Sequence, residues 1–301
     1  MRPIIAVLAA ALCFSTTGTA RALAGVDASS LAVGAARIMV GGALLGLVAI
    51  AARGRTTRPE GSHPPVQRSP AWVLVGSLGV LAYQPAFFLG TGLNGVAIGT
   101  VVALGSAPIA TGILDGVVSR RLPSRRWLVA TAVTLSGVLL TSGLVGAGAM
   151  AIHPVGILAS VGAGASYALY TVAGKQLLDR SWPPVHAMGS IFGVAALLSV
   201  PVLLVSGTGW LLTPAGGALV VWLGVVTTAV AYLLFGWGLA HLPSTTVSTL
   251  TLAEPLSATL LGLVLLREQL SAPSLVGLVA IGLGLALLSL RVGPTSPVGP
   301  E

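Results

Sequence analysis

Long stretches without a charged residue are the feature that most limits how this chain can fold. Residues 69–114, 127–174 and 181–253 contain no Asp, Glu, Lys or Arg and are rich in Leu, Val, Ala and Gly. Each is at least twice as long as the run of about 20 apolar residues that carries a helix across a bilayer. Because apolar residues make up 55% of the 301 positions and charged residues 7%, the sequence predicts an integral membrane protein.

The apolar stretches divide into helical spans, which predicts an all-α membrane protein. The ten expected spans are 3–23, 31–52, 70–91, 96–118, 127–146, 154–174, 185–206, 216–238, 244–266 and 272–290. Residues 53–69 are rich in Arg, Pro, Gly and Ser and are expected to form a flexible loop, as is the tail at 293–301.

The basic residues predict how these spans are oriented. With ten spans and a cytoplasmic start, twelve Lys and Arg residues lie on the cytoplasmic side and two, Arg21 and Arg267, lie outside. Because Lys and Arg in short loops resist translocation, this distribution predicts a multi-pass protein of the cytoplasmic membrane with both termini cytoplasmic. Topology also accounts for the net charge of +8, so no nucleic-acid partner is expected. The alternative is a cleaved secretory signal ending at Gly18-Thr19-Ala20, which would leave nine spans.

One acidic residue stands deep inside an expected span. Glu254 lies about ten residues into the span 244–266, directly before Pro255. A carboxylate at this depth is costly unless it is paired, neutralised or hydrated, which marks Glu254 as a candidate functional residue. Pro255 removes a backbone donor and is expected to break the helix near Thr251. Thr251, Glu254 and Ser257 would share one helix stripe, where they are expected to bind substrate.

Two segments carry a family resemblance. Ala253-Glu254-Pro255, Leu266-Arg267-Glu268-Gln269-Leu270 and the Gly-rich stretch that follows resemble the carboxy-terminal repeat of EamA-type transporters in the drug/metabolite transporter (DMT) superfamily. An earlier segment resembles the amino-terminal repeat of the same family. It comprises Gly105-Ser106-Ala107-Pro108, then Ser119-Arg120-Arg121-Leu122-Pro123, then Trp127 to Leu140. This copy departs from the family pattern, since glycine, serine and alanine precede the proline and arginine replaces the usual turn glutamate. The resemblance implies a transporter with the EamA/DMT fold.

The two halves align as an internal repeat, expected at 1–146 and 147–292. Placing Pro108 on Pro255 also places Arg120 on Arg267, and both prolines are expected helix breaks. Because each copy has five spans, the second enters the membrane in the opposite sense. Inverted repeats of this kind place the substrate near the midplane and alternate its exposure by rocking one half against the other.

Further polar residues inside spans are candidate substrate ligands. Arg37 would bind a substrate carboxylate, or else snorkel or pair with a structural carboxylate. Tyr83 and Gln84 directly precede Pro85, where a kink would present them to the cavity, and Tyr167 and Tyr170 would face it as well.

Three other residues near span ends are given different roles. Asp115 and Arg120 are expected to form an interfacial salt bridge or a gate rather than to bind substrate. Tyr232 could also face the cavity, but it is assigned to the membrane interface, where tyrosine and tryptophan near span ends more often lie.

These residues and the resemblance together favour a secondary transporter that exports small metabolites such as amino acids by alternating access. Efflux of drugs or cationic compounds, and metabolite uptake, are alternatives on the same fold. No GxxxxGK[ST] motif is present, so ATP is not expected to drive transport, and no cofactor or metal is expected. A membrane-embedded enzyme is disfavoured because no histidine shares a span with Glu254 or Asp115. Protons are a candidate coupling ion, membrane lipid surrounds the chain, and both a monomer and a homodimer are compatible with the fold.

Overall fold

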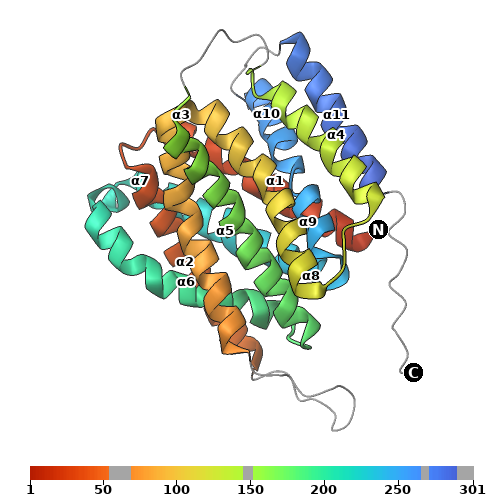
Figure 1. Cartoon of the computed structure of the whole chain (residues 1–301). Helices are drawn as coiled ribbons and strands as arrows, with labels where there is room; N and C mark the ends of the chain where they lie inside the picture. The colour runs from red at the N-terminus through yellow and green to blue at the C-terminus, as the bar shows by residue number, and fades with distance from the viewer. Residues whose placement is uncertain (54–68, 145–151, 266–270, 290–301) are drawn as a thin grey trace, which may run out of the picture.

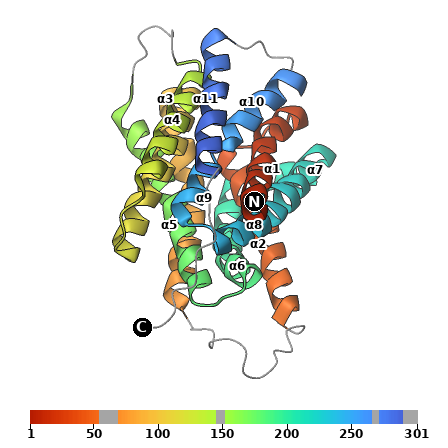
Figure 2. The same ribbon diagram turned by 90° about the vertical axis from the view of Figure 1, so that its right-hand side faces the viewer.

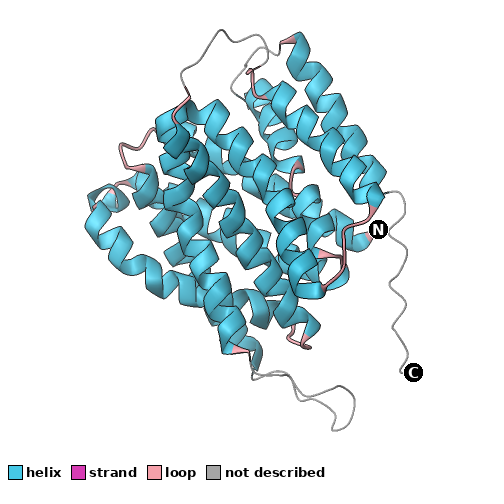
Figure 3. Cartoon of the chain, in the orientation of Figure 1, coloured by secondary structure: helices cyan, strands magenta, loops and turns pink. Residues whose placement is uncertain are grey.

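The computed structural model describes residues 1–53, 69–144, 152–265 and 271–289, and these ranges are helical and contain no strand (Figure 3). Seven helical stretches of this part of the chain are long and apolar enough to cross a membrane. The expected all-helical, multi-pass fold is therefore confirmed. The helices are α1 (Arg2–Ala24), α2 (Ser30–Arg53), α3 (Pro70–Ser119), α4 (Arg125–Thr141), α5 (Pro154–Asp179), α6 (Pro184–Ser206), α7 (Pro214–Gly224), α8 (Ala231–His241), α9 (Ser244–Leu250), α10 (Ala253–Leu265) and α11 (Ala272–Ser289), with a 3₁₀ turn η1 (Gly209–Leu212) and a π-helix η2 (Val225–Val230).

The helix α3 contains a chain reversal. A straight helix of 50 residues would be about 75 Å long, more than twice the thickness of a bilayer core. Its backbone leaves helical geometry at Gly95, where φ is 79° and ψ is 159°, a conformation that glycine adopts without a steric penalty. Figure 1 shows the resulting two limbs meeting near the top of the view. The expected connection between spans 70–91 and 96–118 is thus shorter than predicted, with helical backbone on both sides of Gly95.

The two prolines expected to break helices behave differently. The chain between α9 and α10 leaves the helix at Thr251 and Leu252, and the Thr251 carbonyl accepts a hydrogen bond of 2.9 Å from the Glu254 amide. This carbonyl is the one that Pro255, lacking an N–H, cannot satisfy. Pro108 instead lies within helical backbone, because the non-helical position in α3 is Gly95. The prediction of a break at Pro108 was therefore wrong.

Each half of the chain packs against the other. The helix α2 packs along α6, α4 along α11, α3 along α5, and α1 against α8 and α10. The pair α4 and α11 runs side by side at one edge of the bundle in Figure 1 and lies on the side that faces the viewer in Figure 2. Elements of the two halves therefore alternate throughout the bundle, and the space at its centre is bounded by both.

Glycines permit the closest of these approaches. A Cβ built on Gly46 of α2 would lie 3.4 Å from the Cα of Gly193 in α6, and a Cβ built on Gly137 of α4 would lie 2.6 Å from the carbonyl oxygen of Gly277 in α11. Small residues drive helix association in lipid because they let backbones come into van der Waals contact. The α2–α6 and α4–α11 interfaces both use this kind of contact.

Candidate functional site

Two adjoining hollows at the centre of the bundle share Arg37, Tyr83, Tyr170 and Tyr232, and we treat them together as the central cavity. The larger hollow has a volume of about 60 Å³, enough for a few water molecules. The remaining lining comes from α1, α2, α3, α5, α6, α9, α10 and η2: Phe14, Ile38, Val80, Gln84, Ala103, Leu104, Ala107, Tyr167, Phe192, Thr228, Ser248, Thr251, Leu252 and Glu254.

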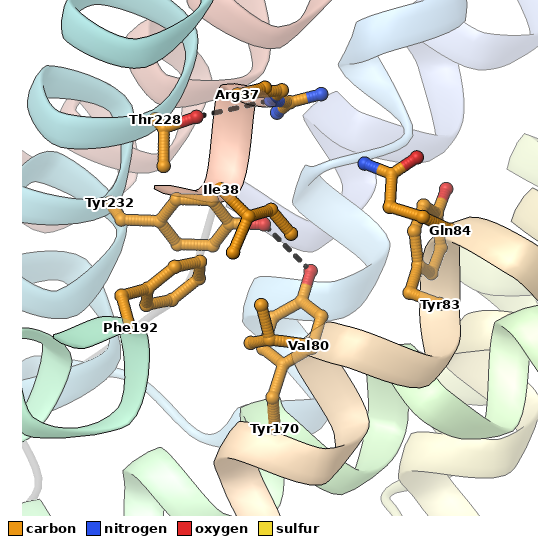
Figure 4. A pocket seen from close by; sticks show the side chains of 9 residues that line it. All are labelled: Arg37, Ile38, Val80, Tyr83, Gln84, Tyr170, Phe192, Thr228 and Tyr232. Carbon is orange, nitrogen blue, oxygen red and sulfur yellow. Dashed lines mark hydrogen bonds between the residues drawn. The ribbon is translucent and has the colours of Figure 1, made fainter. Parts of the chain in front are cut away.

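Arg37 is held at one wall of this cavity by the π-helix η2. Its Nε donates to the Thr228 hydroxyl at 3.1 Å, and its Nη2 donates to the Thr227 carbonyl at 3.0 Å. The wider turn of a π-helix leaves carbonyl groups free of the regular i→i−4 pattern, and one of them receives the guanidinium. Figure 4 shows the Arg37 side chain lying beside Thr228 at the edge of the pocket. The Arg37 guanidinium is therefore held in place by uncharged partners, and its remaining N–H groups are available to a ligand.

Glu254 lines the same cavity from the start of α10. Because the helix is interrupted at Thr251 and Leu252, the end of α9 and the beginning of α10 both lie at the central cavity. The Thr251 hydroxyl is hydrogen-bonded to the Tyr167 hydroxyl at 2.9 Å and donates to the Ser248 carbonyl at 2.8 Å. Among the residues that the structure describes, Arg37 and Glu254 form no ion pair with each other. One cavity therefore holds a cation and an anion that do not neutralise each other by direct contact.

Aromatic rings make up the wall between these two charges. The Tyr232 hydroxyl donates to the Tyr170 hydroxyl at 3.1 Å (Figure 4). The ring centroids of Phe192 and Tyr232 lie 4.0 Å apart, those of Tyr167 and Tyr170 lie 5.0 Å apart, and Phe14 packs on Tyr232 at 5.1 Å. Rings packed at these distances form a rigid surface with polar hydroxyl tips. The cavity wall is thus apolar in area and polar at a few fixed points.

Tyr83 and Gln84 enter the cavity from the first limb of α3. Gly34, one turn before Arg37 on α2, makes room for Gln84, since a Cβ at Gly34 would lie 2.9 Å from the Gln84 Cδ atom. The amide of Gln84 and the guanidinium of Arg37 both line the first hollow (Figure 4). The Gln84 amide, an uncharged hydrogen-bond donor and acceptor, therefore lies close to Arg37.

Most residues proposed from the sequence to bind substrate meet in this cavity. Arg37, Tyr83, Gln84, Tyr167, Tyr170, Thr251 and Glu254 all line it. Ser257 does not appear in its lining. Thr228 and Tyr232 are lining residues that the sequence-based prediction missed. The consecutive threonines 227 and 228 beside Tyr232 are the sequence signal that would have found them.

Asp115 and Arg120 lie elsewhere. Asp115 lines a separate cavity at the end of the bundle where α3 ends and α4 begins. Arg120 ends α3 with a left-handed backbone, φ 54°, and its side chain is exposed. Within the described ranges the two residues form no ion pair, so of the two roles expected for them only that of a gate stays a prediction. No group of three His, Cys, Asp or Glu residues placed to hold a metal ion occurs in the same ranges.

A bundle of membrane-spanning helices around a central cavity that contains an arginine and a glutamate, bounded by both halves of the chain, defines a multi-pass membrane transport protein. The chain belongs to the EamA-like transporter family, whose sequence profile matches residues 1–143 and again residues 154–290.

Individual relatives agree with this assignment. The chain is 36% identical to "Uncharacterized transporter YwfM" of Bacillus subtilis over 285 residues, which cover 94% of this chain and 92% of the relative. It is 31% identical to "Threonine/homoserine exporter RhtA" of Escherichia coli K12 over 240 residues, covering 78% and 74%. The RhtA protein of Salmonella typhimurium LT2 is 30% identical over 220 residues, covering 71% and 69%. One solved crystal structure has the same fold, with a TM-score of 0.78 at 22% identity over 96% of both chains.

Proposed function

We propose that this protein exports a small amino acid or a closely related compound across the cytoplasmic membrane, binding it in the central cavity. Relatives that share about a third of their residues with the chain over two thirds or more of its length are named threonine/homoserine exporters. Threonine and homoserine each carry one ammonium, one carboxylate and one hydroxyl group. A site for such a compound needs an anion, a cation and hydroxyl or amide partners.

The observation that carries the proposal is that Arg37 and Glu254 line one cavity without forming an ion pair. The Arg37 guanidinium suits a substrate carboxylate, because its fork of donors matches two carboxylate oxygens. Glu254 suits the ammonium group. Gln84 and the hydroxyls of Ser248 and Thr251 line the remaining polar positions. A zwitterion would compensate both charges at once, where either charge alone would be costly at this depth.

The proposed transport cycle rests on two inverted five-helix halves, residues 1–146 and 147–292, that make ten crossings. The family profile matches the chain twice, which supports two copies of one unit. In the two repeats α2 corresponds to α6, α4 to α11 and α1 to α5. The α2–α6 and α4–α11 contacts therefore each join a helix to its own counterpart in the other half. Rocking of one half against the other would then open the central cavity to each side in turn. The Lys and Arg distribution supports an orientation with both termini in the cytoplasm.

Efflux of cationic compounds is a second candidate, favoured by the aromatic wall. The rings of Phe14, Tyr167, Tyr170 and Tyr232 line the same hollow as Glu254, and Phe192 packs against Tyr232. Aromatic faces attract organic cations, and the carboxylate would supply the counter-charge. In that case Arg37 would have a structural role, through its hydrogen bonds to η2, and would not contact the ligand.

Counterflow in proteoliposomes distinguishes the two candidates. Vesicles containing the purified chain are loaded with one compound and given a radiolabelled trace of the same compound outside, for the twenty common amino acids, homoserine and a set of quaternary amines. We expect accumulation of a small amino acid that is lost in both Arg37→Gln and Glu254→Gln. Accumulation of quaternary amines that survives Arg37→Gln would favour the second candidate. If Glu254→Gln exchanges every compound at the wild-type rate, the central role of this carboxylate is refuted.

The same vesicles test protons as the coupling ion. A pH-sensitive dye trapped inside reports whether proton movement accompanies export, and a coupled carrier would give a signal that depends on the amino acid. Glu254→Gln, which cannot carry a proton, should abolish the signal. Amino-acid export without a dye response would identify facilitated exchange instead.

A further inference from the structure

A second cavity lies at the end of the bundle that the basic residues predict to be cytoplasmic. We call it the vestibule. It has a volume of about 570 Å³, within the range of small-molecule sites and far larger than the central cavity. The end of α3, the start of α4, the end of α5 and the α8–α9 connection form its walls, and Trp127 and Leu242 supply apolar lining.

Two opposite charges in the vestibule have no partner in the part of the chain that the structure describes. Asp115 is half-buried and Arg121 is exposed, both line the cavity, and neither takes part in an ion pair. The left-handed turn at Arg120 reverses the chain after α3, so that the Arg121 carbonyl would lie 3.4 Å from a Cβ on Gly116. The turn thereby folds the Arg121 backbone onto Gly116, the residue that follows Asp115.

The other charged groups of the vestibule are already engaged. Lys175 and Asp179 form an ion pair of 3.0 Å along α5. Arg126 donates from Nε to the Leu287 carbonyl at 2.8 Å, and its Nη2 reaches the same oxygen. The charges that remain for a ligand are therefore one carboxylate and one guanidinium, the same pair that the central cavity contains.

A buried hydroxyl completes this arrangement. Ser244 lines the vestibule, its side chain is 1% exposed, and its Oγ has no hydrogen-bond partner. A buried hydroxyl without a partner is costly, so such a group in a cavity wall points to a ligand or water that satisfies it. The next two residues, Thr245 and Thr246, line the same cavity. Three successive residues of one cavity wall therefore carry hydroxyl groups.

We propose that the vestibule is a second binding site for a zwitterionic amino acid, which is held by Asp115, Arg121 and the Ser244 hydroxyl before it moves to the central cavity. This inference rests on the proposed function. The segment after Pro243 links the two sites, since Ser244, Thr245 and Thr246 line the vestibule while Ser248 and Thr251 line the central cavity. An amino acid would pass along one hydroxyl-bearing segment from the first site to the second.

Thiol labelling tests this proposal, because Cys13 is the single cysteine in the sequence. In a Cys13→Ala background, Thr246→Cys reports on the vestibule and Ser248→Cys reports on the central cavity. The rate of labelling by a small methanethiosulfonate is measured on the full chain with and without L-threonine. N-acetyl-L-threonine, which lacks the positive charge, and L-threonine amide, which lacks the negative charge, are the matched controls.

We expect L-threonine at ten times its Kd to slow labelling at Thr246→Cys about tenfold, in proportion to the site's occupancy. The slowing should persist when Arg37→Gln and Glu254→Gln disable the central site, and should be lost in Asp115→Asn and in Arg121→Gln. Neither control compound should match L-threonine.

Three results would overturn the second site: no slowing at Thr246→Cys, slowing that vanishes with the central substitutions, or equal slowing by either control compound. The second of these would make the vestibule a passage without its own affinity. Failure of the proposed function has a different signature, namely absent counterflow and no protection at Ser248→Cys, whatever happens at Thr246→Cys.

Discussion

The Nε atom of Arg37 and the hydroxyl of Thr228 form a hydrogen bond of 3.1 Å that joins α2 in the first half of the chain to η2 in the second. Thr228 also donates to the Leu223 carbonyl at 2.9 Å and packs against Gly41. The residue thus fixes both the position of the guanidinium and the distance between the two elements. The cation of the central cavity is placed by a contact that crosses between the halves.

Replacing Thr228 by valine should weaken substrate binding more than replacing it by serine. Valine keeps the branched shape that packs on Gly41 but removes the acceptor, and a hydrogen bond to a charged group contributes about 1.5–3 kcal/mol. We expect the KM for counterflow to rise roughly tenfold or more in Thr228→Val. Thr228→Ser keeps the hydroxyl and should stay within about threefold of wild type. Equal KM values for the Thr228→Val and Thr228→Ser variants would mean that Arg37 does not need this hydrogen bond.

Trp127 should stabilise the packing of α4 against α9. Its indole Nε1 donates to the Thr245 carbonyl at 2.8 Å and lies 3.0 Å from the Thr249 hydroxyl, which is itself 2.9 Å from the Thr131 hydroxyl. Trp127→Phe keeps an aromatic ring and removes the donor. We expect the free energy of unfolding in mixed detergent micelles to fall by about 1–3 kcal/mol.

Trp237→Phe is the matched control for this substitution. Trp237 is 38% exposed on α8, so its replacement should change the unfolding free energy by less than about 0.5 kcal/mol. Equal losses in the two variants would show that ring size, and not the Trp127 hydrogen bonds, determines stability.

Gly42 should tolerate no side chain, because α2 and α6 touch there. A Cβ on Gly42 would overlap the carbonyl oxygen of Phe192, whose ring lines the central cavity. Overpacking of this kind costs about 1–3 kcal/mol, and here it would also move a wall of the site. We expect Gly42→Ala to lower both the unfolding free energy and the counterflow rate. Gly18→Ala, which has open space around it on α1, should be neutral or slightly stabilising. If both alanine variants behave alike, the close approach of α2 and α6 is not needed.

Isolated charges in apolar spans were the part of the site that could be predicted from sequence. Arg37 and Glu254 stand out because a charge at this depth is retained only where it has a use. Both line the central cavity. Tyr232 could not be found in this way, since a tyrosine near a span end fits the membrane interface equally well. Its place in the wall follows from packing against Phe192, which no local pattern encodes.

Backbone irregularities explain the other differences from expectation. The stripe of Thr251, Glu254 and Ser257 assumed one regular helix, but the chain leaves the helix at Thr251 and Leu252, so these residues do not follow a single helical face. The break in the first half lies at Gly95 and not at Pro108, because the reversal uses φ 79° with ψ 159°, a conformation that glycine adopts without a steric penalty, while proline fits within the backbone of α3. The apolar pattern predicts that these stretches are helical, and it predicts their interruptions poorly.

Asn94 should hold the two halves together at the end of the bundle opposite the vestibule. Its side chain is buried beside Gly95, its Nδ2 donates to the His153 carbonyl at 3.0 Å, and its Oδ1 accepts from the His153 amide at 2.6 Å. Gly156 lies directly against it, since a Cβ there would overlap the Asn94 amide nitrogen. The chain reversal of α3 is thereby fastened to the beginning of α5. This contact must open if the central cavity is to face that side of the membrane.

Removing this fastening should shift the protein toward the state that opens at the Asn94 end. Asn94→Ala leaves the His153 amide without a partner, whereas the His153 carbonyl still accepts from the Gly156 and Ile157 amides. Loss of the two Asn94 hydrogen bonds is a change of about 1–3 kcal/mol in favour of separation, which corresponds to roughly a 5- to 150-fold change in the ratio of the two states. In a Cys13→Ala background, a cysteine at Ser160 should then react faster with a methanethiosulfonate. Asn94→Asp, which keeps the acceptor and loses the donor, should give an intermediate rate. If labelling at Ser160→Cys is unchanged in Asn94→Ala, the pair stabilises only the start of α5 and plays no part in opening.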